Sequence, residues 1–160
     1  MSSSDRRLFL AGLTALAGCG FTPVYAPDGP AANLEGLIDL PTPDDEEGFA
    51  LVRRLEERLG TPDAPVYQLF GDIRIREEGV GFLPDGTISR FNVLGQVAWR
   101  LVRLNDEVLM LSGVEKSFTG YSTTSTTVAT TVAQRDARRR LMVILADRIA
   151  ADILLRSTLL

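Results

Sequence analysis

The 160-residue sequence predicts a single α+β domain, in which a mixed, mostly antiparallel four-stranded sheet carries two helices packed on one face. Two observations carry this prediction. Apolar and polar residues alternate with a period of two from Val66 to Tyr121, as in strands with one buried and one solvated face. Before and after this region, apolar residues recur at helical spacing. A helix between the first two strands allows them to lie parallel.

The first strand is predicted in the apolar segment 34–40. A helix then begins with Thr42 as N-cap and Pro43 at its first position, and residues 44–47 place four carboxylates where the helix dipole favours them. Gly60 ends this helix. We interpret the four acids as structural, because contiguous carboxylates at a helix start do not converge on one metal ion.

Three antiparallel strands follow between residues 66 and 121. The turn signal Pro84–Thr87 separates the first from the second, and Asn105–Asp106 separates the second from the third. The side chains predicted to face the core are Tyr67, Leu69, Ile73 and Ile75 on the first of these strands, and Phe91, Val93, Val97, Trp99 and Leu101 on the second.

A long amphipathic helix is predicted from about Thr127 to Arg156. Its apolar row recurs every four residues and consists of Ala137, Leu141, Leu145, Ile149 and Ile153. The run Arg138–Arg140 points in different directions around the helix, so we interpret it as a partly solvated face rather than an anion site.

With both helices on one side, the other face of the sheet is left for a ligand or partner. Strand alternation places Arg74, Arg76, Arg90 and Arg100 on this face. Gathered guanidinium groups would suit an anionic, amphipathic ligand or a partner surface. The competing interpretation is that these arginines only keep a wet sheet face soluble.

Composition excludes several classes of function. The formal net charge is −4 and Lys116 is the single lysine, which argues against nucleic acid as a partner. The chain has no histidine, so the commonest general base and metal ligand are missing. Neither a nucleophile elbow nor a phosphate-cradling glycine loop is present. We therefore expect no enzymatic activity, no metal and no cofactor.

The N-terminal region is typical of a bacterial lipoprotein signal. Arg6 and Arg7 precede an apolar run too short to span a bilayer, and small residues lead to Cys19, the single cysteine. We expect residues 1–18 to be a signal peptide, Cys19 to be lipidated, 19–33 to be a tether and 34–160 to be the folded domain. Export through the general or the twin-arginine route stays open.

The segment Cys19-Gly-Phe-Thr-Pro-Val-Tyr25, together with the strand meander, Tyr121 and the helix start at 132–137, resembles the lipopolysaccharide-assembly lipoprotein family LptE in its alphaproteobacterial form. The resemblance implies an outer-membrane lipoprotein, anchored by lipid with its domain on the periplasmic side. Its implied partners are the β-barrel protein LptD and lipopolysaccharide, which it would help to insert into the outer membrane. The alternative is an auxiliary lipoprotein of a periplasmic lipid-transport ABC system.

Overall fold

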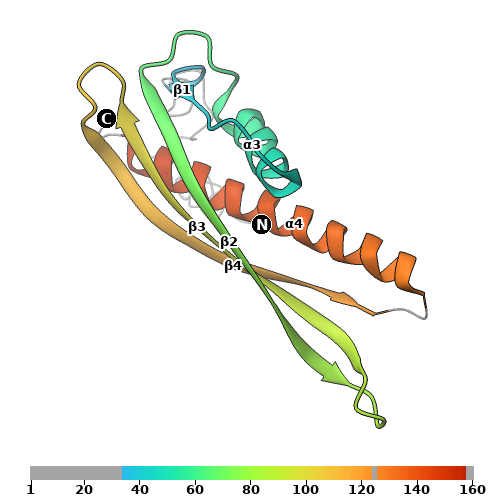
Figure 1. Cartoon of the computed structure of the whole chain (residues 1–160). Helices are drawn as coiled ribbons and strands as arrows, with labels where there is room; N and C mark the ends of the chain where they lie inside the picture. Colours follow the sequence, from blue (N-terminus) through green and yellow to red (C-terminus); the bar gives the residue numbers. More distant parts are fainter. Residues whose placement is uncertain (1–33, 124–125, 158–160) are drawn as a thin grey trace, which may run out of the picture.

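The computed structural model describes residues 34–123 and 126–157. The elements, in chain order, are β1 (Ile38–Asp39), α3 (Glu46–Leu59), β2 (Tyr67–Phe82), β3 (Ile88–Arg103), β4 (Leu109–Ser122) and α4 (Thr127–Leu155) (Figure 1). The strands form one sheet in the order β1-β2-β3-β4. β1 is parallel to β2 and the other pairs are antiparallel. The predicted α+β fold class is confirmed.

The first strand is shorter than predicted. A strand over 34–40 was expected, but β1 consists only of Ile38–Asp39. The chain turns at Gly36, whose φ of 73° lies outside the extended region, and the Gly36 N–H donates to the carbonyl of Leu59. Leu34 and Ile38 still reach the core, so the apolar segment packs as predicted without remaining extended.

The first helix begins later than predicted. We expected the pair Thr42–Pro43 to start it, but α3 (Glu46–Leu59) has Asp45 as its N-cap. The Asp45 carboxylate accepts a 2.6 Å hydrogen bond from the N–H of Gly48. Aspartate is a somewhat better N-cap than threonine, so the cap lies three residues further on. The predicted end at Gly60 is confirmed, with φ of 84° at that residue.

The three long strands pair in the predicted meander, and the predicted alternation is confirmed. Ile73 of β2 lies opposite Val97 of β3, and Val97 lies opposite Glu115 of β4, so all three share the face that carries the helices. The fully or nearly buried side chains of that face are Tyr67, Leu69, Val93, Val97, Trp99, Leu101, Leu111 and Tyr121. Gly86, with φ of 82°, forms the predicted turn between β2 and β3.

Helix α4 closes the core. Its predicted apolar row is almost completely buried, and its N-cap is Thr126. The helix approaches the sheet closely at Gly95 of β3, where a Cβ atom would lie only 2.7 Å from the side chain of Leu141. A glycine at this point of the strand therefore allows the helix to settle onto the sheet.

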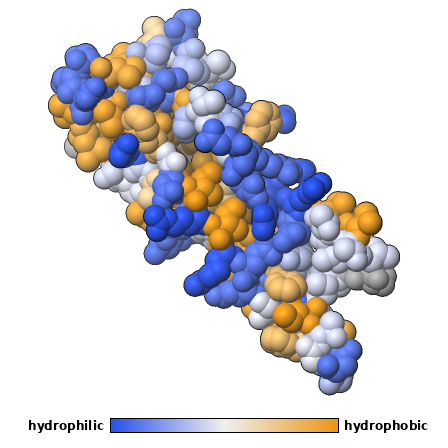
Figure 2. Space-filling view, viewed as in Figure 1, coloured by the Kyte–Doolittle hydropathy of each residue, from blue (hydrophilic) through white to orange (hydrophobic). Residues whose placement is uncertain are grey.

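The β2–β3 hairpin continues past the beginning of α4 and projects from the body of the molecule (Figure 1). Phe82 and Leu83 near its turn are exposed. In the space-filling view, hydrophobic surface is visible near the lower end of this hairpin (Figure 2).

Candidate functional site: the open face of the sheet

The candidate site is the face of the sheet opposite the helices, which we call the open face. Its side chains come from alternate residues of the three long strands and include Gln68, Phe70, Asp72, Arg74, Arg76 and Glu78 of β2, Arg90, Asn92, Leu94, Gln96, Ala98, Arg100 and Val102 of β3, and Ser112, Val114, Lys116 and Phe118 of β4. Five of these side chains are cationic and two are carboxylates, although the chain as a whole carries a formal charge of −4. The open face is therefore a basic surface on an acidic protein.

The strand register concentrates cations at the middle of the open face. Arg74, Gln96 and Lys116 lie side by side across β2, β3 and β4. Arg76 and Leu94 lie in the next row, two residues along the strands. Together these five residues line a shallow depression of about 350 Å³. Three cations and an apolar side chain thus border one hollow.

Apolar side chains flank this depression. Phe118, opposite Leu94, is 66% exposed, and Val114 on the same strand is 52% exposed. Exposed apolar groups beside cations can contact both parts of a ligand that has a charged head and a hydrocarbon region.

The other two predicted arginines share the face but lie away from the depression. Arg100 stacks on the ring of Phe70, with its guanidinium carbon 4.6 Å from the ring centroid. Arg90 is ten residues from Arg100 on the same strand, or roughly 33 Å at 3.3 Å per residue. The four predicted arginines therefore share one face of the sheet, but only Arg74 and Arg76 lie close together.

Carboxylates on β2 partly neutralise the two central arginines. Arg74 forms a 3.0 Å ion pair with Asp72, and Arg76 forms a 2.9 Å ion pair with Glu78. Both arginine side chains are more than 70% exposed, so these pairs are weak and can exchange for another anion.

Lys116 was missed as a site residue by sequence reasoning. Alternation along β4 could have assigned it to the open face, but its position beside Gln96 and Arg74 depends on the register between strands. That register is set by turn geometry and core packing, which the local sequence pattern does not give.

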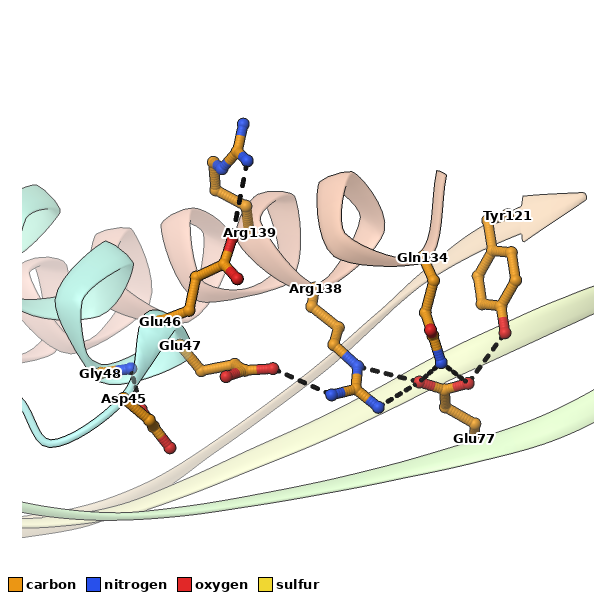
Figure 3. Close-up of polar contacts among 9 residues, drawn as sticks. All are labelled: Asp45, Glu46, Glu47, Gly48, Glu77, Tyr121, Gln134, Arg138 and Arg139. Carbon is orange, nitrogen blue, oxygen red and sulfur yellow. Dashed lines mark hydrogen bonds and ion pairs between the residues drawn. The ribbon is translucent and has the colours of Figure 1, made fainter. Parts of the chain in front are cut away.

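A second polar cluster lies on the helix side of the sheet and centres on Glu77 (Figure 3). The Glu77 carboxylate accepts hydrogen bonds from Arg138 at 2.7 and 2.9 Å, from Gln134 at 2.9 and 3.0 Å, and from the hydroxyl of Tyr121 at 2.9 Å. Arg138 also donates to Glu47 of α3 at 3.0 Å. One carboxylate therefore joins β2 to β4 and α4, and its arginine partner extends the contact to α3.

The environment of this cluster shifts two pKa values. Burial alone would raise the pKa of Glu77, but hydrogen bonds from Arg138, Gln134 and Tyr121 outweigh burial and hold that pKa below its ordinary value. Burial, followed by the hydrogen bond to Glu77, raises the pKa of Tyr121 to about 12. Both groups keep their usual charge states at neutral pH, which fits a structural role.

The arginine run in the first half of α4 is divided between roles. Arg138 belongs to the Glu77 cluster, Arg139 lies 3.7 Å from Glu46, and Arg140 pairs with Asp136 at 2.9 Å. A hollow of about 290 Å³ beside Arg138 and Arg139 also contains Glu46 and Glu47. Because carboxylates occupy this hollow, it is a poorer anion site than the depression on the open face.

Within residues 34–123 and 126–157, no group of acidic, cysteine or histidine side chains could hold a metal ion. No helix in the described chain is long and apolar enough to cross a membrane. Cys19 and the predicted tether lie outside the described residues.

Comparison with known proteins gives the family. The model of the LptE family, described as lipopolysaccharide-assembly, matches residues 37–153, which is most of the chain. The chain belongs to the LptE family. A comparison with curated proteins finds no match.

Solved structures of lipoproteins share the LptE fold seen here. A protein described as a lipoprotein from Caulobacter crescentus has a TM-score of 0.66 at 20% identity, covering 80% of this chain and 98% of that one. The rare lipoprotein B from Shewanella oneidensis has a TM-score of 0.58 at 13% identity, covering 76% and 94%. A minor lipoprotein from Acinetobacter baumannii has a TM-score of 0.54 at 16% identity, covering 74% and 89%.

Proposed function

We propose that this LptE-family protein is an outer-membrane lipoprotein that partners an LptD-type β-barrel and assists the insertion of lipopolysaccharide into the outer membrane. In this proposal Cys19 carries the lipid anchor and the folded domain lies on the periplasmic side. The protein acts by binding and positioning, without catalysis. The family match supports lipopolysaccharide assembly over the alternative of an auxiliary lipoprotein for a lipid-transport ABC system.

The observation that carries the lipid part of this proposal is the depression bordered by Arg74, Arg76 and Lys116. Lipopolysaccharide is an anionic amphiphile whose phosphates accept charge-assisted hydrogen bonds from arginine and lysine. Leu94 lines the same hollow and Phe118 lies beside it, so apolar groups are available for the acyl region. We propose that this central group, rather than all four predicted arginines, forms the lipid contact.

The barrel part of the proposal is supported by the polar character of the open face. A barrel of the outer membrane has a polar interior, so a protein that lies within it needs polar surfaces. The open face offers amide, hydroxyl and charged groups along three strands. It can serve lipid and barrel together if the two contact different rows of the sheet.

Titration of lipopolysaccharide against the full chain tests the lipid contact. The variant R74Q/R76Q/K116Q removes the three cations of the depression without introducing carboxylates. Its binding free energy should weaken by about 2–5 kcal/mol in total, because hydrogen bonds to charged groups contribute about 1.5–3 kcal/mol each and each glutamine keeps a neutral donor that recovers part of this contribution. The matched control R53Q/R135Q/R139Q removes the same charge from the two helices and should bind almost as the wild type.

Unchanged affinity in a folded R74Q/R76Q/K116Q variant would remove the central depression as the lipid site. Co-purification in mild detergent tests the partner separately. A large outer-membrane barrel should accompany the wild-type protein, whereas recovery of an inner-membrane transporter in its place would support the alternative function.

A further inference from the structure

The free edge of strand β4 is covered by the side chains of α4. β4 is the last strand of the sheet, so the backbone groups on its outer side have no partner strand within the described residues. Two arginines of α4 and its C-cap residue, Arg156, donate side-chain hydrogen bonds to outward-facing carbonyl oxygens of β4. Arg140 binds Gly120, Arg148 binds Lys116 and Arg156 binds Ser112.

The spacing of these contacts is regular along both elements. The arginines recur every eight residues of the helix, a rise of about 12 Å at 1.5 Å per residue. The carbonyls recur every four residues of the strand, a distance of about 13 Å at 3.3 Å per residue. The two advances match, so one helix can cap the strand edge at three successive points.

Two of the three arginines are also held by acids on their own helix. Arg140 pairs with Asp136 at 2.9 Å and Arg156 pairs with Asp152, in each case four residues earlier. Arg156 also lies over the ring of Trp99, 5.2 Å from its centroid. These contacts orient the guanidinium groups, which lowers the entropic cost of keeping them on the strand edge.

An uncovered β4 would be prone to pair with another strand. It is 14 residues long, and Val114 and Phe118 on it are more than half exposed. Long, apolar edge strands with free N–H and C=O groups are templates for edge-to-edge association. Val114 and Phe118, which suit β4 for contact with lipid, therefore also make its edge prone to pair with another strand.

We propose that Arg140, Arg148 and Arg156 close the β4 edge against strand addition by a second copy of this chain. The β4 strand of a second copy can pair with this edge when the arginines do not cover it. Antiparallel pairing of two β4 strands about Val114 places Val114 opposite itself and Ser112 opposite Lys116 of the second copy, without opposing like charges. The guanidinium groups bind the carbonyl oxygens of β4 that such a pair would need, so the sheets of two copies stay separate.

The opposite edge of the sheet is protected in a different way. β1 covers only Tyr67 and Gln68 of β2, and the rest of that edge has no strand beside it within the described residues. β2 carries Asp72, Arg74, Arg76 and Glu78 at alternate positions, and such charges discourage edge pairing. β4 has only Lys116 at the equivalent positions, which is why its edge depends on the helix.

The test compares the oligomeric state of full-chain variants by sedimentation velocity. R140A/R148A/R156A opens the edge, and we expect its dimer dissociation constant to fall by at least about tenfold relative to the wild type. The control R53A/R135A/R139A removes the same charge from the helices away from β4 and should remain like the wild type. Adding V114P should reverse dimerisation, because the Val114 N–H points outward and its loss leaves the β3–β4 ladder intact.

Hydrogen exchange provides a second readout, since the amides of Val114 and Phe118 should become protected only in the dimer. A folded triple variant that stays monomeric would overturn the proposal, and so would dimers that persist with V114P or form equally in the control. If the loss of Arg156 from Trp99 unfolds the triple variant, R140A/R148A decides by the same criteria.

Discussion

The hydroxyl of Tyr121 on β4 donates a 2.9 Å hydrogen bond to the carboxylate of Glu77 on β2, so the contact spans the intervening strand β3. Arg138 and Gln134 of α4 bind the same carboxylate. This carboxylate is the point at which strands that are not neighbours, and the helix above them, are held together.

Replacing Glu77 by Gln should destabilise the domain by about 2 kcal/mol, because it removes charge-assisted hydrogen bonds and leaves Arg138 poorly compensated. Urea denaturation measures the free energy of unfolding. Glu78→Gln is the matched control, since Glu78 lies on the open face and its pair with Arg76 is exposed. A similar small loss for both variants would contradict the structural role of Glu77.

The Glu77 cluster should also make stability depend on acid pH. The pKa of Glu77 is lowered in the folded state from 4.5, so its contribution is present above that value and is lost as pH falls through the folded pKa. Melts of the wild type and of Glu77→Gln should therefore converge at low pH. A constant difference between them from neutral to acid pH would exclude this linkage.

Stability should also fall as pH rises into the alkaline range, and the residue responsible there is Tyr121. Its pKa is raised from 10.0 to about 12 on folding, so its contribution is complete below 10.0 and is lost as pH rises toward about 12. Tyr121→Phe should lack this loss. The measurement is the difference in unfolding free energy between the two proteins across that range, and a difference that does not change with pH would refute the assignment.

Trp99 lies between two glycines in one row of the sheet, and the two should respond differently to alanine. A Cβ atom at Gly113 would lie 2.9 Å from the indole, whereas one at Gly71 would lie 3.6 Å from Val97. Gly113→Ala should cost about 1–3 kcal/mol through overpacking. Gly71→Ala should be neutral or slightly stabilising because it reduces the freedom of the unfolded chain. Thermal melts that rank the two variants in reverse order would contradict this packing.

The two outlying arginines give a prediction about the extent of the proposed lipid site. R90Q/R100Q should weaken lipopolysaccharide binding less than R74Q/R76Q/K116Q does, because Arg90 and Arg100 lie away from the depression. The titration described above compares the two variants directly. A larger effect of R90Q/R100Q would move the lipid contact to the ends of the open face.

Cys19→Ala should abolish incorporation of labelled palmitate, because the chain has no other thiol. The domain should then leave the membrane fraction unless its partner retains it. Label on the alanine variant would show that residues 1–18 are not a lipoprotein signal.

Sequence patterns predicted those parts of the fold that depend on local order. Alternation assigned both faces of β2 and β3, and the four-residue recurrence from Ala137 to Ile153 assigned the buried side of α4. The same logic failed at Thr42, because several residues near a helix start can serve as the N-cap and the best hydrogen-bond geometry decides among them.

The candidate site was predictable in part. Alternation placed Arg74 and Arg76 on the open face, but the depression also needs Lys116 from a third strand, and only the register brings it there. The Glu77 cluster was not foreseen, because its members come from four separate elements. The sequence could not predict the arginines that cap β4 either, because their hydrogen-bond partners are backbone carbonyls, which produce no pattern of residue types.

Helix α4 follows the three long strands in the chain, and this order has a consequence for folding. The three long strands are consecutive and joined by short turns, so their pairing is local and can form early. Nine buried side chains of the core belong to α4. Until this last helix docks, a strand meander would present a bare apolar face and an uncapped edge. Docking of α4 therefore completes the core and ends a period of exposure to aggregation, during which a chaperone would find its binding surface on the apolar face of the sheet.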